Sequence, residues 1–267
     1  MIKINHLALL LEIYSLLVVG SIQAQSPYQF NFKNESKYVL GGLTTYAVGS
    51  LVSSPGNPLT LKNISELEVD DLLALDRNVI HNSNHQHALM SDHIFNGAFA
   101  LPLLFLTQER TRKDFSKIGL LYLETVLLSG GVTNMTKSIF KRPRPYVYNE
   151  FADVERKISQ NAQRSFISGH TSLTATNSFF MAKVFNDYFP DSKLKPYVWA
   201  TAAIVPAVVG YLRVSSGNHF PTDVTAGYLI GAAIGFGVPH LHKIKVGKES
   251  HINVQGSPGN LSLNLKF

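Results

Sequence analysis

Apolar residues gather into six long segments, separated by short polar or charged stretches. The segments are continuous rather than alternating, and their lengths lie near the minimum for crossing a bilayer, which favours helices over strands. Two of them, Tyr197–Leu212 and Val224–Pro239, carry no charged residue, whereas a surface helix of a soluble bundle would carry a polar face. The pattern predicts an all-α bundle of about six helices, at Tyr38–Ser54, His93–Thr107, Ile118–Met135, Ser172–Phe185, Pro196–Leu212 and Val224–Pro239.

The last of these segments has glycines at regular spacing. Gly227, Gly231 and Gly235 recur every four residues and therefore share one helix face. Such spacing lets helix backbones approach closely.

The N-terminus follows the pattern of a secretory signal peptide. One lysine precedes a mostly apolar stretch, Leu7–Gly20, and Ser21–Ala24 is a plausible cleavage site. We therefore expect residues 1–24 to be a signal peptide that exports the chain to the cell envelope, with an uncleaved anchor as the alternative.

The C-terminal tail has a different pattern. His251–Gln255 and Leu261–Phe267 flank a Gly-Ser-Pro-Gly-Asn turn, and apolar residues alternate with polar ones in the second run. This predicts a short β-hairpin. Because neither a linker nor an internal repeat divides the rest, we expect one helical domain over residues 25–242 and a hairpin tail over residues 243–267.

Basic residues exceed acidic ones by 24 to 18 and form short clusters between apolar segments, with no nucleic-acid-binding motif. If the last five segments cross a membrane, three clusters lie on one side, which the positive-inside rule makes cytoplasmic. If Tyr38–Ser54 also crossed after a cleaved signal, the basic clusters would lie outside. We therefore expect that segment to lie flat or to pack without crossing, and a soluble protein is the alternative. The clusters are Arg110, Arg112, Lys113 and Lys117; Lys193 and Lys195; and Lys243, Lys245 and Lys248.

Three short stretches place charged and polar residues at the ends of apolar segments. The first runs from Lys137 to Pro145 and holds Arg144 in a proline-stiffened loop. The second, Arg164–Ser172, places small residues before a helix, where free backbone N–H groups bind anions. The chain has no cysteine, so thiol nucleophiles and disulfides are excluded.

The third stretch runs from Arg213 to Asp223 and contains His219. His219 and Asp223 are four residues apart and share a face if the stretch is helical. Asp223 would then accept the Nδ1–H of His219 and leave Nε2 free as a nucleophile. A His–Asp pair at this spacing is usually structural when it stands alone.

Together the three stretches resemble the signature of the type 2 phosphatidic acid phosphatase superfamily, which also contains class A acid phosphatases and vanadium haloperoxidases. The resemblance covers roughly Ile118 to Pro239, with Ile167 and Leu212 replacing a common proline and a common serine. It implies a phosphatase that needs no metal or other cofactor.

The resemblance also implies a role for each motif residue. His219 would be the nucleophile, and Asp223 would orient it. His170 would give a proton to the leaving oxygen and later take one from water. The phosphoryl group would be bound by Lys137, Arg144, Arg213, and the amides of Ser168 and Gly169 with the Ser168 hydroxyl.

We expect a phosphorylated lipid as substrate, because the segments are apolar, and a membrane-embedded protein with its site on the extracytoplasmic face. The alternatives are a soluble secreted acid phosphatase, a lipid-phosphate phosphotransferase and a vanadate-dependent haloperoxidase. No nucleic-acid partner is expected.

Two further groups of residues are weaker candidates. The loop between the first two motifs would overhang the site and offer Tyr146, Tyr148, Phe151 and Arg156 to the substrate. A loose group of histidines and aspartates upstream matches no standard ligand spacing, so we expect no metal there. This group comprises Asp76, His81, His85, His87, Asp92 and His93.

Overall fold

The computed structural model describes residues 26–29, 32–52, 58–244, 251–257 and 260–266. Its elements are α2 (Phe32–Val52), α3 (Leu61–Ser65), η1 (Val69–Asp71), α4 (Ala74–Arg77), α5 (His85–Ala98), η2 (Leu101–Leu106), α6 (Glu109–Lys113), α7 (Phe115–Phe140), α8 (Pro145–Tyr148), α9 (Val154–Lys157), η3 (Gln160–Gln163), α10 (Gly169–Tyr188), α11 (Lys195–Ser215), α12 (Pro221–His242), β1 (His251–Ser257) and β2 (Asn260–Lys266).

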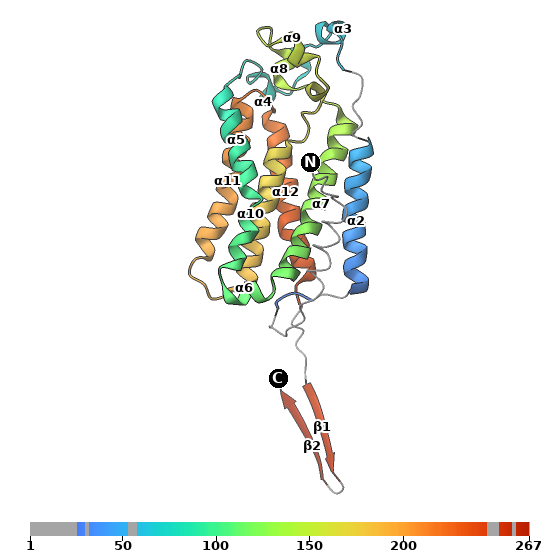
Figure 1. Cartoon of the computed structure of the whole chain (residues 1–267), viewed down its shortest axis with the longest axis vertical. Helices are drawn as coiled ribbons and strands as arrows, with labels where there is room; N and C mark the ends of the chain where they lie inside the picture. The colour runs from blue at the N-terminus through green and yellow to red at the C-terminus, as the bar shows by residue number, and fades with distance from the viewer. Residues whose placement is uncertain (1–25, 30–31, 53–57, 245–250, 258–259, 267) are drawn as a thin grey trace, which may run out of the picture.

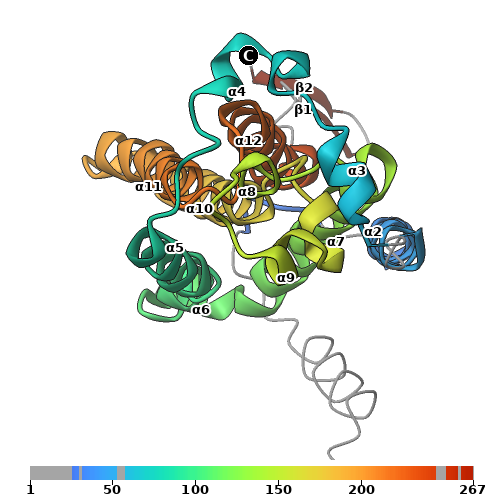
Figure 2. The same cartoon turned by 90° about the horizontal axis from the view of Figure 1, so that it is seen from above.

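Six long helices form an upright bundle, and each overlaps one of the predicted apolar segments (Figure 1). The poorest match is the segment predicted at His93–Thr107, which covers only the end of α5 and continues through η2. Helix α10 lies at the centre and packs against α12, α11, α7 and α5 (Figure 2). The all-α class is confirmed for the helical body. The predicted number of about six helices is wrong, because the polar connections also form short helices that no long apolar run predicts. Among these are α3, α4, α6, α8 and α9.

The glycines of α12 bring it against α10. A β-carbon on Gly227 would lie 2.7 Å from the carbonyl oxygen of Ser168, and one on Gly231 or Gly235 would collide with the α10 backbone. Only glycine allows two helices to approach this closely. The N-termini of the two helices consequently meet, and the Ser168 amide donates to the Asp223 carbonyl oxygen at 3.1 Å.

Helix α2 runs along α7 in the same direction. A β-carbon on Gly42 would touch Leu127, and one on Gly49 would approach the Gly131 carbonyl oxygen to 2.6 Å. The segment predicted at Tyr38–Ser54 therefore packs along α7. Its apolar part, Val39–Leu51, is shorter than the candidate membrane spans, so the expectation that it packs without crossing stays a prediction.

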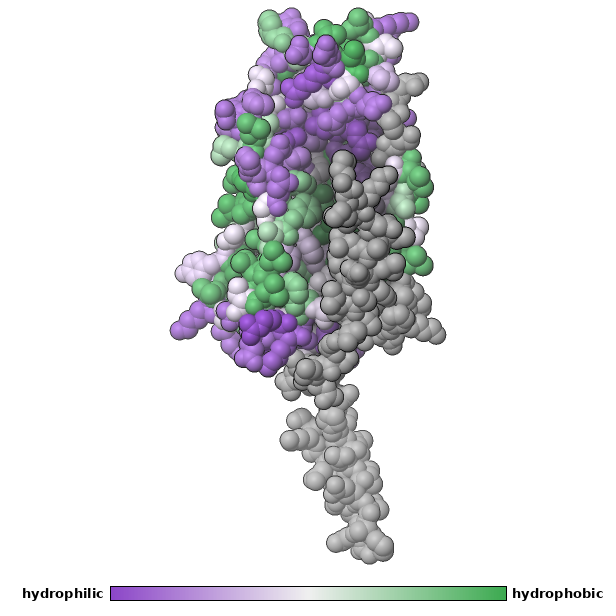
Figure 3. Space-filling view, viewed as in Figure 1, coloured by the Kyte–Doolittle hydropathy of each residue, from purple (hydrophilic) through white to green (hydrophobic). Residues whose placement is uncertain are grey.

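The bundle is an integral membrane domain. Among the described residues, four helical segments are long and apolar enough to cross a membrane: His85–Leu106, Phe115–Tyr148, Lys195–Ser215 and Pro221–His242. The face in Figure 3 shows a belt of hydrophobic residues between hydrophilic regions towards the two ends. The central helix α10 is not one of the four, since its many serines and threonines make it too polar. These side chains are largely buried against the neighbouring helices.

The described N-terminal residues lie at the lower end of the bundle in Figure 1, beside the end of α12. Tyr28 forms an antiparallel bridge with Lys243, and the Gln29 amide donates to the His242 carbonyl oxygen at 3.0 Å. The predicted signal peptide lies outside the described residues.

The tail beyond α12 contains a pair of antiparallel strands. β1 pairs with β2 from His251 opposite Lys266 to Ser257 opposite Asn260. This is the segment whose alternating pattern predicts a hairpin.

Candidate active site

The loop between α11 and α12 holds His219 inside the upper end of the bundle. Gly217 has a left-handed φ of 68°, and a β-carbon there would collide with the Asn82 carbonyl group, so this turn requires glycine. The amides of Asn218 and His219 both donate to the Arg213 carbonyl oxygen, at 3.1 and 3.3 Å. This tight turn leaves the His219 side chain 1 % exposed.

Two of the three predicted phosphate-binding cations are held by neutral oxygens. Lys137, in the last turn of α7, donates from Nζ to the Arg164 carbonyl oxygen at 2.7 Å. Arg144, at the start of α8, donates to the Asn161 carbonyl and amide oxygens at 2.9 Å and to the Asn218 carbonyl oxygen at 3.1 Å. Both side chains are buried, so their charge is poorly screened by water.

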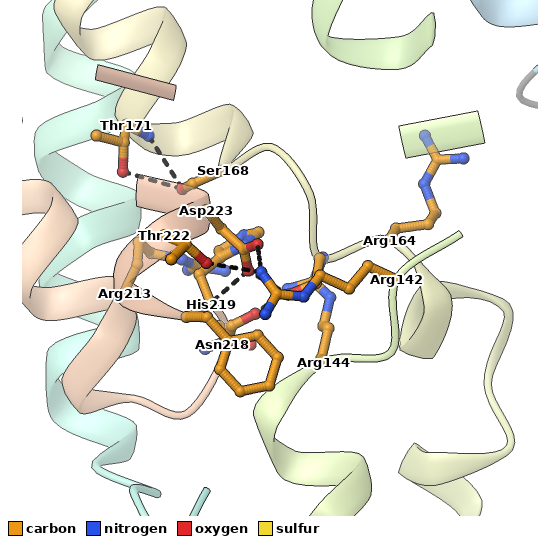
Figure 4. Close-up of polar contacts among 12 residues, drawn as sticks. Arg142, Arg144, Arg164, Ser168, Thr171, Arg213, Asn218, His219, Thr222 and Asp223 are labelled. Atoms are coloured by element: carbon orange, nitrogen blue, oxygen red, sulfur yellow. Dashed lines mark hydrogen bonds and ion pairs between the residues drawn. The ribbon is translucent and has the colours of Figure 1, made fainter. Parts of the chain in front are cut away.

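The third cation, Arg213, belongs to the last turn of α11 and is also buried. Its guanidinium donates to Asp92 Oδ1 at 3.1 Å and to the Ser91 hydroxyl at 3.2 Å. Figure 4 shows Arg144, Arg213 and His219 gathered from separate elements around one point.

The electrostatic environment of His219 reflects this convergence. Burial lowers the pKa of His219 well below its ordinary value, and the charges of Arg144, Lys137 and Arg213 lower it further. The imidazole is therefore neutral at physiological pH, the form in which a ring nitrogen has a lone pair to attack with.

His170, in the first turn of α10, contacts an acid from another helix. Its Nε2 lies 2.8 Å from Asp92 Oδ1, and its ring packs on Phe95 with centroids 4.4 Å apart. Burial and the Arg213 charge lower the pKa of His170 to about 4, and Asp92 only partly offsets them. His170 is thus neutral near pH 7, as expected for a group that takes up a proton when an anion binds.

Asp223 lies beside His219, but their predicted hydrogen bond is not formed. His219 Nδ1 and Asp223 Oδ2 are 3.6 Å apart, beyond hydrogen-bonding distance. Asp223 instead accepts from Arg142 at 2.6 Å, the Ser165 hydroxyl at 2.5 Å and the Phe220 amide at 2.9 Å. These donors satisfy the carboxylate and hold it in place.

The Ser168–Gly169 motif begins α10 as predicted, with one difference. Ser168 is the N-cap, and its hydroxyl accepts from the Thr171 amide at 3.4 Å. The Ser168 amide, predicted to bind phosphate, already donates to the Asp223 carbonyl oxygen, because α12 packs so closely on α10. A β-carbon on Gly169 would lie 3.7 Å from Lys137 Cε, which places Gly169 beside a cation of the site.

The sequence analysis missed several residues of the site. Arg142 stands in the Lys-Arg-Pro-Arg-Pro run beside Arg144, and Ser165 stands three residues before Ser168. Asp76 and Asp92 appeared only as members of a loose acidic and histidine group. The structure gives them separate partners, since Asp76 binds Arg142 and Asp92 binds His170.

The loop between the first two motifs does overhang the site. The Arg156 guanidinium lies 4.0 Å above the Tyr146 ring and donates to the Asn218 side-chain oxygen at 3.1 Å. Tyr148 packs edge-on to Phe220, next to His219. Phe151 is 85 % exposed, so it projects away from these contacts.

Comparison with known proteins places these observations in a family. The family model described as PAP2 superfamily matches residues 118–246. A lipid A 4'-phosphatase of Porphyromonas gingivalis is 26% identical over 136 residues, or 50% of this chain and 54% of the relative. A lipid A 1-phosphatase of Rhizobium johnstonii is 31% identical over 142 residues, or 52% of this chain and 54% of the relative. The chain thus spans about half the length of these curated relatives.

One solved structure is also similar, that of a transmembrane PAP2-type phosphatidylglycerolphosphate phosphatase from Bacillus subtilis. It is 24% identical, with a TM-score of 0.46, and the match covers 79% of this chain and 98% of that one.

Proposed function

The chain belongs to the PAP2 superfamily, and from this membership we propose that it is a membrane phosphatase that removes phosphate from a lipid through a phosphohistidine at His219. The observation that carries the proposal is the convergence of Lys137, Arg144 and Arg213 on one buried, neutral histidine. Phosphoryl transfer needs a nucleophile in line with the leaving oxygen and positive charge around the transferred group.

In the first step, His219 Nε2 forms a bond to phosphorus while the bond from phosphorus to the leaving oxygen breaks. The three cations stabilise the charge on the phosphoryl oxygens, and each preorganised donor of this kind is worth about 3 kcal/mol in a transition state. His170, protonated as the dianion binds, gives its proton to the leaving oxygen.

In the second step, His170 takes a proton from water, and the oxygen of that water attacks phosphorus. The bond between phosphorus and His219 breaks, and phosphate leaves. Asp223 stabilises the positive charge that His219 acquires in the intermediate, and their 3.6 Å contact shortens in the complex.

The substrate we propose is a phosphorylated lipid, with glycolipids of the lipid A type tested first. Two curated relatives carry lipid A phosphatase names, and they act on different phosphates, the 4'- and the 1-phosphate. The four candidate spans support a lipid substrate, because lipid would then surround the bundle that holds the proposed site. Isoprenoid diphosphates and glycerophospholipid phosphates belong to the same panel.

We propose that the site faces the extracytoplasmic side. Arg110, Arg112 and Lys113 on α6 lie at the lower end of the bundle in Figure 1, whereas α8 and α9 cover the site at the upper end. The positive-inside rule makes the lower end cytoplasmic. Tyr28 is bound at that same end, so an extracytoplasmic peptidase would not reach a cleavage site at Ala24. If the active site faces outward, the predicted cleavage after Ala24 does not occur, so these two predictions cannot both hold.

Labelling of single cysteines decides the orientation, and the chain offers a cysteine-free background. Phe151→Cys, at the site end, should react with an impermeant maleimide in intact cells, and Lys193→Cys should react only after lysis. The reverse result would put the basic end outside and make cleavage after Ala24 possible.

The activity test measures phosphate release by detergent-purified protein in the presence of a chelator. The panel holds a lipid A-type phosphate, phosphatidic acid, phosphatidylglycerol phosphate, an isoprenyl diphosphate and a soluble aryl phosphate, each with His219→Ala as control. We expect release from lipids that His219→Ala abolishes. Preference for the aryl phosphate would contradict the lipid substrate, and release that survives His219→Ala would contradict the mechanism.

A further inference from the structure

A buried acid outside the matched family region contacts the residues that hold the catalytic pair. Asp76 lies on the short helix α4, and its side chain is 0 % exposed. Its Oδ2 accepts from Arg142 at 2.8 Å and from the Thr222 hydroxyl at 2.6 Å, and its Oδ1 accepts from the Thr222 amide at 3.2 Å. Every polar contact of this carboxylate among the described residues therefore leads towards the first turn of α12.

Arg142 continues the chain of contacts to Asp223. One guanidinium nitrogen donates to Asp76, and the other donates to Asp223 Oδ1 at 2.6 Å and to the Thr222 hydroxyl at 2.8 Å. The Arg142 Cζ lies 4.2 Å from the centre of the Phe220 ring. A planar guanidinium can bridge two carboxylates in this way, whereas an ammonium group lacks the fork.

Asp76 also fixes the helix that carries Asp223. Thr222 is the second residue of α12, so its amide is one of those without a partner inside the helix. Asp76 supplies that partner, and a negative charge is favourable at a helix N-terminus. Figure 4 shows Arg142, Thr222 and Asp223 linked in this arrangement beside His219.

We propose that Asp76 is a positioning residue, which acts through Arg142 and Thr222 to set the orientation of Asp223 and hence of His219. The inference rests on the proposed function, because it takes His219 as the nucleophile. It assigns a role in the reaction to α4, which precedes the residues matched by the family model.

The distances explain why Asp76 is needed. Asp223 and His219 are 3.6 Å apart, so a small rotation of the carboxylate decides whether their hydrogen bond forms in the complex. Without Asp76, Arg142 keeps one carboxylate and the Thr222 amide loses its acceptor. Two of the restraints on Asp223 therefore loosen, while the Ser165 hydroxyl and the Phe220 amide still donate to its Oδ2. Misplacement of a catalytic group by about 1 Å costs on the order of 100-fold in rate.

The test is Asp76→Asn with Asp70→Asn as the matched control. Asp70 is on the neighbouring η1, and its side chain is 93 % exposed and pairs only at the surface with Arg77. We expect kcat to fall about 30-fold in Asp76→Asn, within the range for groups that orient catalytic residues. The KM and the inhibition constant of sulfate should stay within about twofold, since Asp76 touches none of the three cations. Asp70→Asn should leave all three constants unchanged.

A double-mutant cycle tests the route through Arg142. Arg142→Lys keeps the charge but not the bridge, so we expect a loss similar to that of Asp76→Asn and little further loss when the two are combined. Multiplied losses would mean that the residues act separately and would overturn the proposal. If Asp76→Asn does not fold, Thr222→Val, which removes only the shared hydroxyl, takes its place in the cycle.

A readout without substrate separates this inference from the proposed function. In ¹⁵N-histidine-labelled protein, the His219 resonance is the one missing in His219→Ala. We expect Asp76→Asn to shift that resonance and Asp70→Asn to leave it in place. If Asp76→Asn shifts the His219 resonance but the wild-type protein hydrolyses nothing on the panel, the proposed function is contradicted and the link from Asp76 to His219 is retained. An unmoved resonance together with unchanged kcat would overturn the link.

Discussion

The two ends of the bundle bury charge in opposite ways. At the upper end, the contacts of Lys137 and Arg144 in the described chain are with carbonyl and amide oxygens. At the lower end, Lys183 and Lys243 both pair with the Asp187 carboxylate, to which the Tyr28 hydroxyl also donates. The positive charges of Lys137 and Arg144 are thus not neutralised by these contacts, whereas those of Lys183 and Lys243 are neutralised by a carboxylate.

The difference distinguishes cations whose charge is available to an anion from cations that stabilise the fold. A neutral oxygen holds a buried cation in place without cancelling its charge, so the full charge remains available to an anion. A carboxylate cancels the charge, and the pair then fixes the positions of the elements that carry it. Arg213 is intermediate, because it shares Asp92 with His170. The difference supports the proposal that the cations at the upper end bind phosphate, whereas those at the lower end hold the N-terminal segment against α10 and α12.

The sharpest test of this difference is Arg144→Ala. Removal of one preorganised donor should lower kcat/KM about 300-fold. The melting temperature should stay the same or rise, because the substitution also removes the desolvation cost of an uncompensated buried cation. Lys62→Ala, which removes an exposed cation that pairs with Glu66 at the surface, is the control and should change neither quantity. A melting temperature that falls steeply in Arg144→Ala would contradict the proposed difference in charge compensation between the two ends of the bundle.

The second test is Asp187→Asn at the other end. It leaves two lysines facing one neutral amide, and breaking a buried pair in this way costs about 3 kcal/mol of unfolding free energy. Activity per folded molecule should stay within about twofold of wild type, because the pair lies at the far end of α10 from His170. Unfolding in detergent and phosphate release measure the two effects, with exposed Asp191→Asn as the matched control. A large loss of activity in the folded variant would show that the lower end takes part in the reaction.

The smallest expected effect is a pH dependence of anion affinity. The pKa of His170 is about 4 in the empty site, and a bound dianion beside it raises that pKa. Protonation and dianion binding therefore favour each other, so sulfate affinity should rise as pH falls from 7 towards 4 and level off below 4. Sulfate is suitable because it remains a dianion across this range.

Sulfate inhibition constants measured across the pH range check this expectation, and His170→Gln should flatten the profile. The same pKa predicts that the empty protein loses stability as pH falls from about 6.5 to 4, because the unfolded chain then binds the proton that folded His170 excludes. A wild-type affinity that does not change with pH would show that His170 stays neutral in the complex.

Much of the fold could be predicted because its signals are local. A continuous apolar run predicts a helix wherever it occurs, and each of the six predicted segments overlaps a long helix, although His93–Thr107 covers only the end of α5. The glycine spacing of α12 likewise predicts a close approach to a neighbouring helix, and the structure shows that this helix is α10. The short helices α3, α4, α8 and α9 have no such signal, since tertiary contacts rather than periodicity stabilise a single helical turn.

The motif residues and their order were determined by the sequence alone. Lys137, Arg144, His170, Arg213 and His219 stand at recognisable spacings, and the structure brings them to one end of the bundle. Which acids join them was decided only by the tertiary structure. Asp76 and Asp92 come from an upstream stretch without a motif, and they reach Arg142 and His170 because folding brings α4 to the start of α12 and α5 to the start of α10. A local pattern encodes a helix, but the partner of a buried charge is chosen by proximity in space, which residue spacing does not record.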